Sequence, residues 1–282
     1  MSKLESALYI VATPIGNLSD ITLRGLETLK NVDIVACEDT RNTQALLNHF
    51  QITKKLISLH QHNENQKKDL ILSFVKEGKS VAYVSDAGTP CISDPGALLV
   101  NSFYENNLKV IPVPGVSALT TAFSVSGILD NQFKFFGFLS NQKKKLKEEL
   151  KAIYESNNLA IIYESPHRII DLLENIKVIF GSNHQIVIAR ELTKMFETIK
   201  RDTVENILSY INENSNHKKG EFVVIIPPSG VMPLKVEEND LKNALSITQD
   251  YLPTSQSVKL ISTLFKKNKK EVYNLALKKK NE

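Results

Sequence analysis

The sequence contains little cysteine, no tryptophan and no long hydrophobic stretch. Its two cysteines, Cys37 and Cys91, lie far apart and belong to no Cys-x-x-Cys pair, so neither a disulfide framework nor a zinc site is indicated. The longest apolar runs, such as LYIVA and FVVIIPP, are much shorter than the ~20 residues of a membrane-spanning helix. Eleven glycines and ten prolines are too few for a collagen-like or low-complexity chain.

The N-terminal segment MSKLESALYIVATP lacks the pattern of a signal peptide, because its apolar run is short and no small-residue cleavage site follows. The segment is more typical of the first strand of a fold. We therefore expect a cytoplasmic protein with no membrane partner. The composition, with 42% hydrophobic and 23% charged residues in a chain of 282, is globular and fits two compact domains of ordinary size.

The lysines are distributed unevenly along the chain. The net charge is only +4, but residues 143–151 and 266–280 are rich in lysine. Such clusters are typical of proteins that contact a polyanion, although a solvated helix face has the same composition. Charge alone leaves both interpretations open.

Residues 7–113 alternate short apolar runs with helical stretches. This alternation predicts an α/β domain with a parallel sheet, whose strands are joined by crossover helices. Thr22 and Asn63 stand at two expected helix starts and are predicted to cap those helices. The expected strands are 8–12, 33–38, 55–60, 80–86 and 109–114, and the expected helices lie near 22–31, 40–49, 64–77 and 95–106.

The pattern changes after Gly127. More strands follow per helix, and neighbouring strands have short connections, which predicts a mixed sheet of the α+β type. The segment PPSGVMP (227–233) indicates a linker, and residues 237–280 have the spacing of two amphipathic helices. The expected strands here are 133–139, 159–165, 186–191, 196–202 and 221–228, and the expected domains are 1–126, 127–228 and 237–282.

Several common catalytic motifs are absent. The sequence has no Gly-x-Gly-x-x-Gly and no His-Glu-x-x-His, and Gly78-Lys79-Ser80 lacks the upstream glycine and the following helix of a P-loop. Small and polar residues instead follow five successive strands. Because parallel strands end at the same sheet edge, we expect these loops around one crevice, where open α/β sheets bind ligands. The five loops are 12–17, 37–41, 60–64, 85–96 and 114–118.

The loop 85–96, SDAGTPCISDPG, is the most informative of the five. Its glycines and prolines fix an irregular backbone, and Gly88 leaves no side chain between the main chain and a ligand. Exposed main-chain groups there would suit a nucleoside and an amino-acid moiety. The next loop offers a helix N-terminus at Ser117, whose N–H groups favour a carboxylate or hydroxyl. A pair of tight turns would explain the same residue types.

Acidic and histidine side chains in the second and third loops are candidates for proton transfer or for hydrogen-bond clamps. Each of them could instead cap a helix or form a salt bridge. A metal site built from His60, His62 and an acid has only the weak signal of His-x-His on a loop, so we expect no metal. The catalytic candidates are Glu38, Asp39, Arg41, His60 and Glu64, with Arg41 holding a phosphate.

Seven strings, taken in order, resemble the successive motifs of the bacterial small-subunit ribosomal RNA methyltransferase I family, within the tetrapyrrole-methylase-like superfamily. The resemblance runs from Leu8 to about Ile226, and the last helical segment also resembles the small C-terminal domain of that family. Seven long strings in order are far more specific than any one short motif. The strings are VATPIGNLSDIT, CEDTRNTQALL, HQHNE, VSDAGTPCISDPG, PGVSA, YESPHRI and ARELTKMFE.

The resemblance implies two α/β domains of the tetrapyrrole methylase type, with a parallel-sheet N-terminal domain, a mixed-sheet second domain and a small C-terminal helical module. It implies a homodimer that holds S-adenosylmethionine in the cleft between the two α/β domains. The implied reaction is 2′-O-methylation of a cytidine ribose in the decoding centre of 16S rRNA, within the 30S ribosomal subunit. We expect no metal cofactor, and neither DNA nor a membrane as a partner. The implied cofactor contacts are Pro14, Ile15, Asp86, Ala87, Gly88, Thr89, Pro90, Ile92, Ser117, Ala118, Tyr163 and Glu164.

Two alternatives accompany this interpretation. The first is methylation of a tetrapyrrole precursor, but the tetrapyrrole enzymes carry an acidic residue where Asn17 stands, which argues against a porphyrinoid substrate. The second is a ribosome-assembly factor that binds RNA and has lost turnover. That alternative predicts a degraded cofactor loop, whereas SDAGTPCISDPG has all its features.

Overall fold

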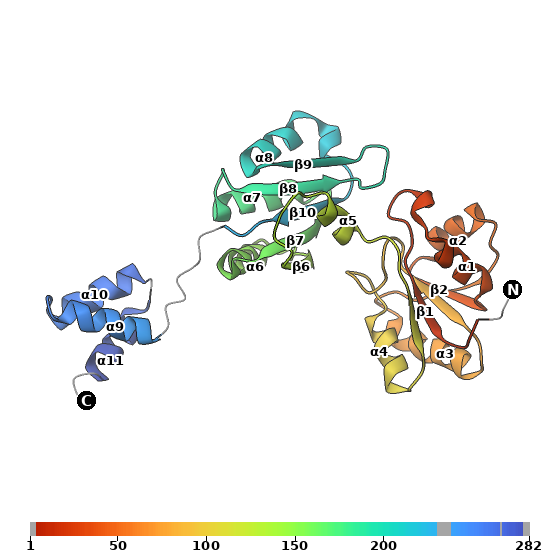
Figure 1. Cartoon of the computed structure of the whole chain (residues 1–282), viewed down its shortest axis with the longest axis horizontal. Helices are drawn as coiled ribbons and strands as arrows, with labels where there is room; N and C mark the ends of the chain where they lie inside the picture. Colours follow the sequence, from red (N-terminus) through yellow and green to blue (C-terminus); the bar gives the residue numbers. More distant parts are fainter. Residues whose placement is uncertain (1–3, 230–237, 266, 279–282) are drawn as a thin grey trace. The chain divides into compact units, whose positions relative to one another are not determined.

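The structure is a computed structural model that describes residues 4–229, 238–265 and 267–278 (Figure 1). The chain divides into two compact units, residues 1–229 and residues 230–282. The first unit contains two five-stranded sheets, and the second is helical where it is described. The boundary expected near residue 126, between the two sheets, stays a prediction.

The first sheet is entirely parallel, as the alternating pattern predicts, with strand order β3-β2-β4-β1-β5. Apolar residues of α1 and α2 pack on one face of the sheet, and those of α3 and α4 pack on the other. The strands are therefore buried on both faces, which explains their continuous apolar runs. The elements are β1 (Leu8–Val11), η1 (Leu18–Asp20), α1 (Leu23–Asn31), β2 (Ile34–Cys37), α2 (Thr40–His49), β3 (Lys55–Ser58), α3 (Glu64–Lys76), β4 (Val81–Val84), α4 (Ala97–Glu105) and β5 (Val110–Val113).

The two predicted helix caps have different outcomes. The side chain of Thr22 accepts a hydrogen bond from the N–H of Gly25 at 3.0 Å, which confirms it as the cap of α1. Asn63 occupies the N-cap position of α3 but makes no side-chain capping bond, so that prediction is wrong. Its side chain points back along the chain, where it accepts from the N–H of His60 and donates to the carbonyl of Ser58.

The second sheet is mixed, as expected, with order β6-β7-β10-β8-β9. Strands β6 and β7 are parallel and the other neighbours are antiparallel. Helices α6, α7 and α8 cover one face, and α5 lies against the other. The elements are α5 (Ala118–Ser124), β6 (Phe133–Phe138), α6 (Lys143–Ser156), β7 (Leu159–Glu164), α7 (Ile169–Phe180), β8 (Gln185–Arg190), β9 (Thr198–Thr203), α8 (Val204–Glu213), η2 (Ser215–Lys218) and β10 (Phe222–Ile226).

The described part of the second unit has three helices where the sequence predicts two: α9 (Glu238–Gln249), α10 (Thr254–Leu264) and α11 (Lys269–Lys278). The additional helix is α9, which contributes Leu241 and Leu245 to the small core that the three helices share. Residues 230–233 of the expected linker, and 266, 279 and 280 of the lysine cluster, lie outside the described residues. Within the three described ranges, no helix has both the length and the apolar character to cross a membrane.

Candidate active site

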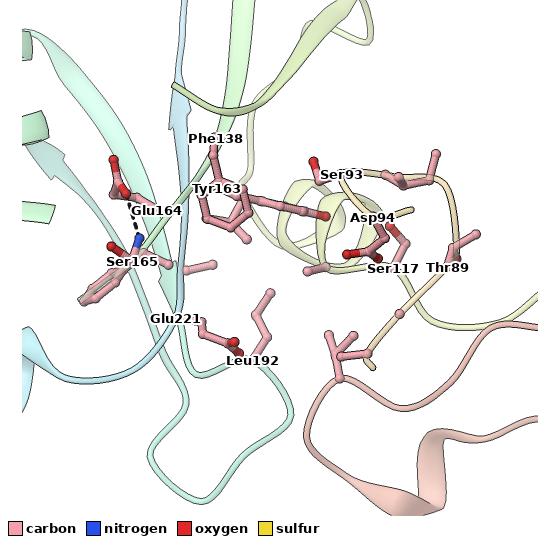
Figure 2. A pocket seen from close by; sticks show the side chains of 18 of the residues that line it. Thr89, Ser93, Asp94, Ser117, Phe138, Tyr163, Glu164, Ser165, Leu192 and Glu221 are labelled. Atoms are coloured by element: carbon pink, nitrogen blue, oxygen red, sulfur yellow. Dashed lines mark hydrogen bonds between the residues drawn. The ribbon is translucent and has the colours of Figure 1, made fainter. Parts of the chain in front are cut away.

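A cavity of about 310 Å³ lies between residues of the first sheet and residues of the second (Figure 2). One wall comes from the loops after β1 and β4 and from the start of α5. The opposite wall comes from the ends of β6 and β7, the loop after β8, and the start of β10. The lining is formed by Ile15, Ala87, Gly88, Thr89, Ile92, Ser93, Asp94, Ser117, Ala118, Phe138, Tyr163, Glu164, Ser165, Pro166, Ala189, Leu192, Lys194, Glu221, Phe222 and Val223.

The strand order explains which of the five predicted loops reach the cavity. Strands β4, β1 and β5 are neighbours in the sheet, so the loops that follow them lie side by side. Strands β2 and β3 occupy the far end of the order, and none of the residues in the loops that follow them lines the cavity. The site is therefore built from three of the five loops together with the second sheet.

The loops after β1 and β4 are joined by a two-residue antiparallel bridge. The N–H of Thr13 donates to the carbonyl of Gly88 and the N–H of Gly88 donates to the carbonyl of Thr13, both at 2.9 Å. The N–H of Gly88 thus helps to hold the two loops together and is not free for a ligand. The glycine is still required by its backbone, because its φ is +78° and an added Cβ would lie 3.4 Å from Ile15.

Nine of the twelve predicted cofactor contacts line the cavity, and Pro14, Asp86 and Pro90 do not. The carboxylate of Asp86 instead accepts hydrogen bonds from the N–H of Asp39 at 3.0 Å and from the side chain of Asn42 at 2.9 Å. Asp86 therefore anchors the start of α2 to the loop after β4. The nine that line the cavity are Ile15, Ala87, Gly88, Thr89, Ile92, Ser117, Ala118, Tyr163 and Glu164.

The five predicted catalytic residues lie outside the cavity lining. Glu64 is buried, and its carboxylate accepts from the N–H groups of Gly96 and Leu99, which caps helix α4. Asp39 caps α2 and forms an ion pair with Arg41, whose side chain is 88% exposed. These contacts stabilise the start of two helices.

Two more of the five predicted catalytic residues, His60 and Glu38, interact with residues that do not line the cavity. A ring nitrogen of His60 lies 3.1 Å from the side-chain nitrogen of Asn63. Burial and the nearby carboxylate of Asp86 raise the pKa of Glu38. The charge of Glu38 also contributes to raising the pKa of Asp94, which lines the cavity.

Eleven lining residues are absent from the set that the sequence predicts. Asp94 and Ser93 belong to the loop 85–96, which the sequence predicts to be a ligand-binding loop, so their position in that loop could have identified them. Glu221, Phe222 and Val223 have no local signal, because they reach the cavity only through the antiparallel pairing of β10 with β7. The remaining residues of this group are Phe138, Ser165, Pro166, Ala189, Leu192 and Lys194.

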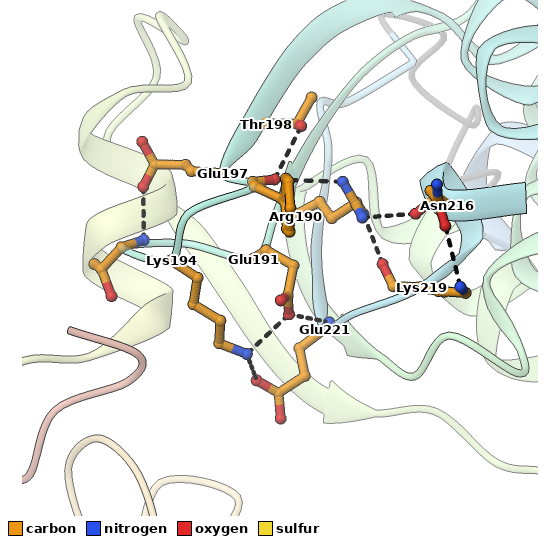
Figure 3. Close-up of polar contacts among 10 residues, drawn as sticks. Arg190, Glu191, Lys194, Glu197, Thr198, Asn216, Lys219 and Glu221 are labelled. Carbon is orange, nitrogen blue, oxygen red and sulfur yellow. Dashed lines mark hydrogen bonds and ion pairs between the residues drawn. The ribbon is translucent and has the colours of Figure 1, made fainter. Parts of the chain in front are cut away.

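Three carboxylates line the cavity, and two of them have cationic partners. Glu164 pairs with Arg168 at 3.0 Å and also accepts from the N–H of Ser165 at 2.8 Å. Glu221 pairs with Lys194 at 3.0 Å, and Lys194 also contacts Glu191 at 2.8 Å (Figure 3). Asp94 has no ion-pair partner within the described ranges.

The surroundings of Asp94 favour its neutral form. Burial raises the pKa of Asp94 from its ordinary value of 3.8 to about 6, and the negative charges of Glu38 and Asp86 contribute to the rise. A hydrogen bond with the side chain of Ser85 acts in the opposite direction but does not cancel the rise. Asp94 is thus a carboxyl group that titrates close to neutral pH in the wall of a cavity.

The loop after β8 is held in place by a buried arginine (Figure 3). The guanidinium of Arg190 donates to the carbonyls of Lys219 and Asn216, both at 2.6 Å, and to the carbonyl of Phe196 at 3.3 Å. These bonds fix both ends of the segment 191–197, which carries Leu192 and Lys194 into the cavity lining. The segment 189–197, with the sequence ARELTKMFE, therefore forms one wall of the site and is held in place by Arg190.

Comparison with known proteins gives one consistent result. Residues 7–208 match the family described as Tetrapyrrole (Corrin/Porphyrin) Methylases. The chain is 41% identical to the ribosomal RNA small subunit methyltransferase I of Haemophilus influenzae, over 98% of both chains. It is 42% identical to the protein of the same name from Escherichia coli O157:H7, over 97% of this chain and 95% of that one. Among solved structures, diphthine synthase has the same fold, with a TM-score of 0.62 at 16% identity over 78% of this chain and 90% of that chain.

Proposed function

The chain belongs to the ribosomal RNA small subunit methyltransferase I family of the tetrapyrrole methylases, and from that premise we propose that it methylates 16S rRNA in the 30S ribosomal subunit. The proposed acceptor is the ribose 2′-hydroxyl of a cytidine in the decoding centre. The observation that carries the proposal is the 41% identity with a small-subunit rRNA methyltransferase over 98% of both chains. The proposed setting is the cytoplasm, where the enzyme acts as a homodimer.

The cofactor is S-adenosylmethionine, and the cavity fits it. Its volume of about 310 Å³ is within the usual range of ligand pockets. Apolar and small side chains such as Ile15, Ala118 and Val223 suit an adenosine. When bound, the cofactor supplies an electrophilic methyl group.

The residues proposed to hold the cofactor are the nine predicted contacts that line the cavity. Small residues of the loop after β4 leave room beside the bridge between Thr13 and Gly88. On the opposite wall, the ring of Tyr163 packs edge-on against Phe138, with 5.9 Å between ring centroids, and offers an apolar surface to the adenine. Glu164 contributes mainly through its backbone, because Arg168 and the N–H of Ser165 already occupy its carboxylate.

An RNA substrate is supported by the surface beside the cavity. Phe138 lines the cavity and is 57% exposed, and only four residues separate it from helix α6. The first turns of α6 carry the exposed lysines Lys143, Lys144, Lys145 and Lys147, with no acidic residue in the first turn. Positive charge is unfavourable at a helix N-terminus, because it opposes the helix dipole, so these lysines do not stabilise the helix. They are instead suited to neutralising the phosphates of a bound polyanion. An exposed aromatic ring beside them suits stacking on an unpaired base.

The proposal is tested by methyl transfer to purified 30S subunits from a strain that lacks this gene. Tritiated cofactor, nuclease digestion and mass spectrometry would locate the label. We expect it on the ribose of a decoding-centre cytidine. Label on a base, on another RNA or only on a tetrapyrrole precursor would contradict the proposed substrate, and the last result would favour the small-molecule alternative. Sedimentation equilibrium tests the homodimer.

A further inference from the structure

We propose that Asp94 accepts the proton of the substrate hydroxyl during methyl transfer. This inference rests on the proposed function and adds a residue to it. A ribose hydroxyl is a poor nucleophile at neutral pH, so a positioned base is expected to assist its attack. The five catalytic candidates chosen from the sequence lie outside the cavity lining, whereas Asp94 is part of it.

The first support is the position of Asp94. It lies on the wall formed by the loop after β4, opposite Glu164 and Glu221 of the second sheet (Figure 2). A group placed between cofactor and acceptor must have a free oxygen facing the cavity. The carboxylates of Glu164 and Glu221 are engaged by Arg168 and Lys194, whereas Asp94 has no cationic partner within the described ranges.

The second support is the charge around Asp94. The charged groups that act on it are the carboxylates of Glu38, after β2, and Asp86, in its own loop. The other titratable groups coupled to it are Cys91, Tyr83 of β4 and Tyr163 of β7, whose raised pKa values keep them uncharged at neutral pH. No lysine or arginine forms an ion pair with it in the part of the chain that the structure describes. Burial and these charges raise its pKa to about 6, which makes its anion a stronger base than an ordinary aspartate, while the group is still ionised at neutral pH.

The proposed step is balanced without another reactant. The hydroxyl oxygen forms a bond to the methyl carbon as the carbon–sulfur bond breaks, and the electron pair of that bond stays on sulfur. The hydroxyl proton moves to a carboxylate oxygen of Asp94, which releases it to water after the product leaves. The positive charge that would otherwise develop on the attacking oxygen is thereby removed as the bond forms.

The test compares wild-type protein with Asp94→Asn in single-turnover methylation of 30S subunits at saturating cofactor. Asparagine keeps the shape of the side chain and cannot take a proton. We expect the rate to fall by about 10²–10⁴-fold. Calorimetric titration should show a cofactor Kd within about threefold of wild type, since a positioned base contributes little to ground-state binding. Asp69→Asn, an exposed residue of α3, is the matched control and should retain both values.

A pH series gives a further readout. The wild-type rate should rise with pH up to about 6, where Asp94 loses its proton, and then level off. Removing the neighbouring charge with Glu38→Gln should move this rise to lower pH, because that charge helps to raise the pKa of Asp94. If Glu38 were the base, Glu38→Gln would abolish turnover and Asp94→Asn would only displace the profile.

The outcomes separate the two proposals. Wild-type activity on 30S subunits together with an active Asp94→Asn variant would overturn the role of Asp94 and leave the proposed function intact. A variant that loses cofactor affinity more than tenfold but turns over normally when saturated would make Asp94 a cofactor ligand, which also overturns the inference. An inactive wild-type protein with normal cofactor binding would overturn the proposed function and this inference with it.

Discussion

The hydroxyl of Tyr163, at the end of β7, accepts a hydrogen bond of 2.9 Å from the backbone N–H of Leu119, in the first turn of α5. The bond joins the second sheet to the segment that leads out of the first sheet, and it lies beside Ala118 and Ser117 of the cavity lining. Burial raises the pKa of Tyr163, so this hydroxyl stays protonated throughout the physiological range.

Tyr163→Phe should therefore weaken cofactor binding without removing the ring that lines the cavity. The variant leaves the N–H of Leu119 without its partner, at a cost of about 1–2 kcal/mol. We expect a lower thermal midpoint and a roughly five- to thirtyfold increase in cofactor Kd, the range that such a loss produces. Tyr104→Phe is the matched control, because Tyr104 is 65% exposed. Equal effects of the two substitutions would contradict the importance of the bond.

Gly96→Ala, at the N-cap of α4, should be strongly destabilising. The backbone φ of Gly96 is +119°, and an added Cβ would clash with the ring of Tyr83 and lie 2.9 Å from Cys91 Sγ. We expect chemical denaturation to show a decrease of about 2–4 kcal/mol in the free energy of unfolding. Gly78→Ala is the control, since Gly78 also has a positive φ of +84° but nothing within 4 Å of its added Cβ. A decrease no larger than that of the control would show that the surrounding side chains can yield.

The pKa of Asp94 predicts how pH acts on stability. The folded-state pKa of about 6 lies above the ordinary 3.8, so the folded protein binds the proton more tightly than the unfolded chain does. Stability linked to this group is fully present below pH 3.8 and is lost as pH rises to about 6. Asp94→Asn removes this loss. Its thermal midpoint should exceed that of wild type near pH 7, with a smaller difference near pH 4. A difference that is independent of pH would contradict the raised pKa.

The lysines of α6 should act on RNA affinity and not on the cofactor. We expect Lys143→Ala/Lys144→Ala to raise the KM for 30S subunits and to make binding less dependent on salt, by about 0.7–0.9 in log–log slope for each phosphate that is no longer neutralised. Filter binding at several salt concentrations measures this slope. Lys67→Ala/Lys68→Ala on α3 is the matched pair and should leave the slope unchanged. A similar change in both pairs would indicate general attraction to the protein's net charge.

The secondary structure of the first unit was predictable because its signals are local. Each buried strand is an apolar run of the right length, and each helix has its own periodicity. The order of the strands was not predictable in the same way, since it depends on which runs pair across the sheet. That order separates Glu38 and His60 from the cavity and brings Ile15 next to Gly88.

Within the site, the sequence did not predict which side chains of a ligand loop face the cavity. The sequence identifies 85–96 as a ligand loop, yet nothing in it distinguishes Asp94 from Asp86. The two differ because Cys91 and Ser93 adopt positive φ values of 68° and 66°, which non-glycine residues seldom take. These left-handed residues turn the chain between Asp86 and Asp94. No composition or spacing rule specifies them.

The packing around Gly96 also has an evolutionary consequence. Glu64 holds the N–H of Gly96, and Tyr83 and Cys91 fill the space where a side chain at that position would go. A lineage could therefore exchange the glycine only after shrinking its neighbours, and each intermediate would be less stable than either end point. Positions 64, 83, 91 and 96 should change together or not at all. The sequence of the loop 85–96 is therefore expected to change slowly in evolution, even at residues that contact neither cofactor nor RNA.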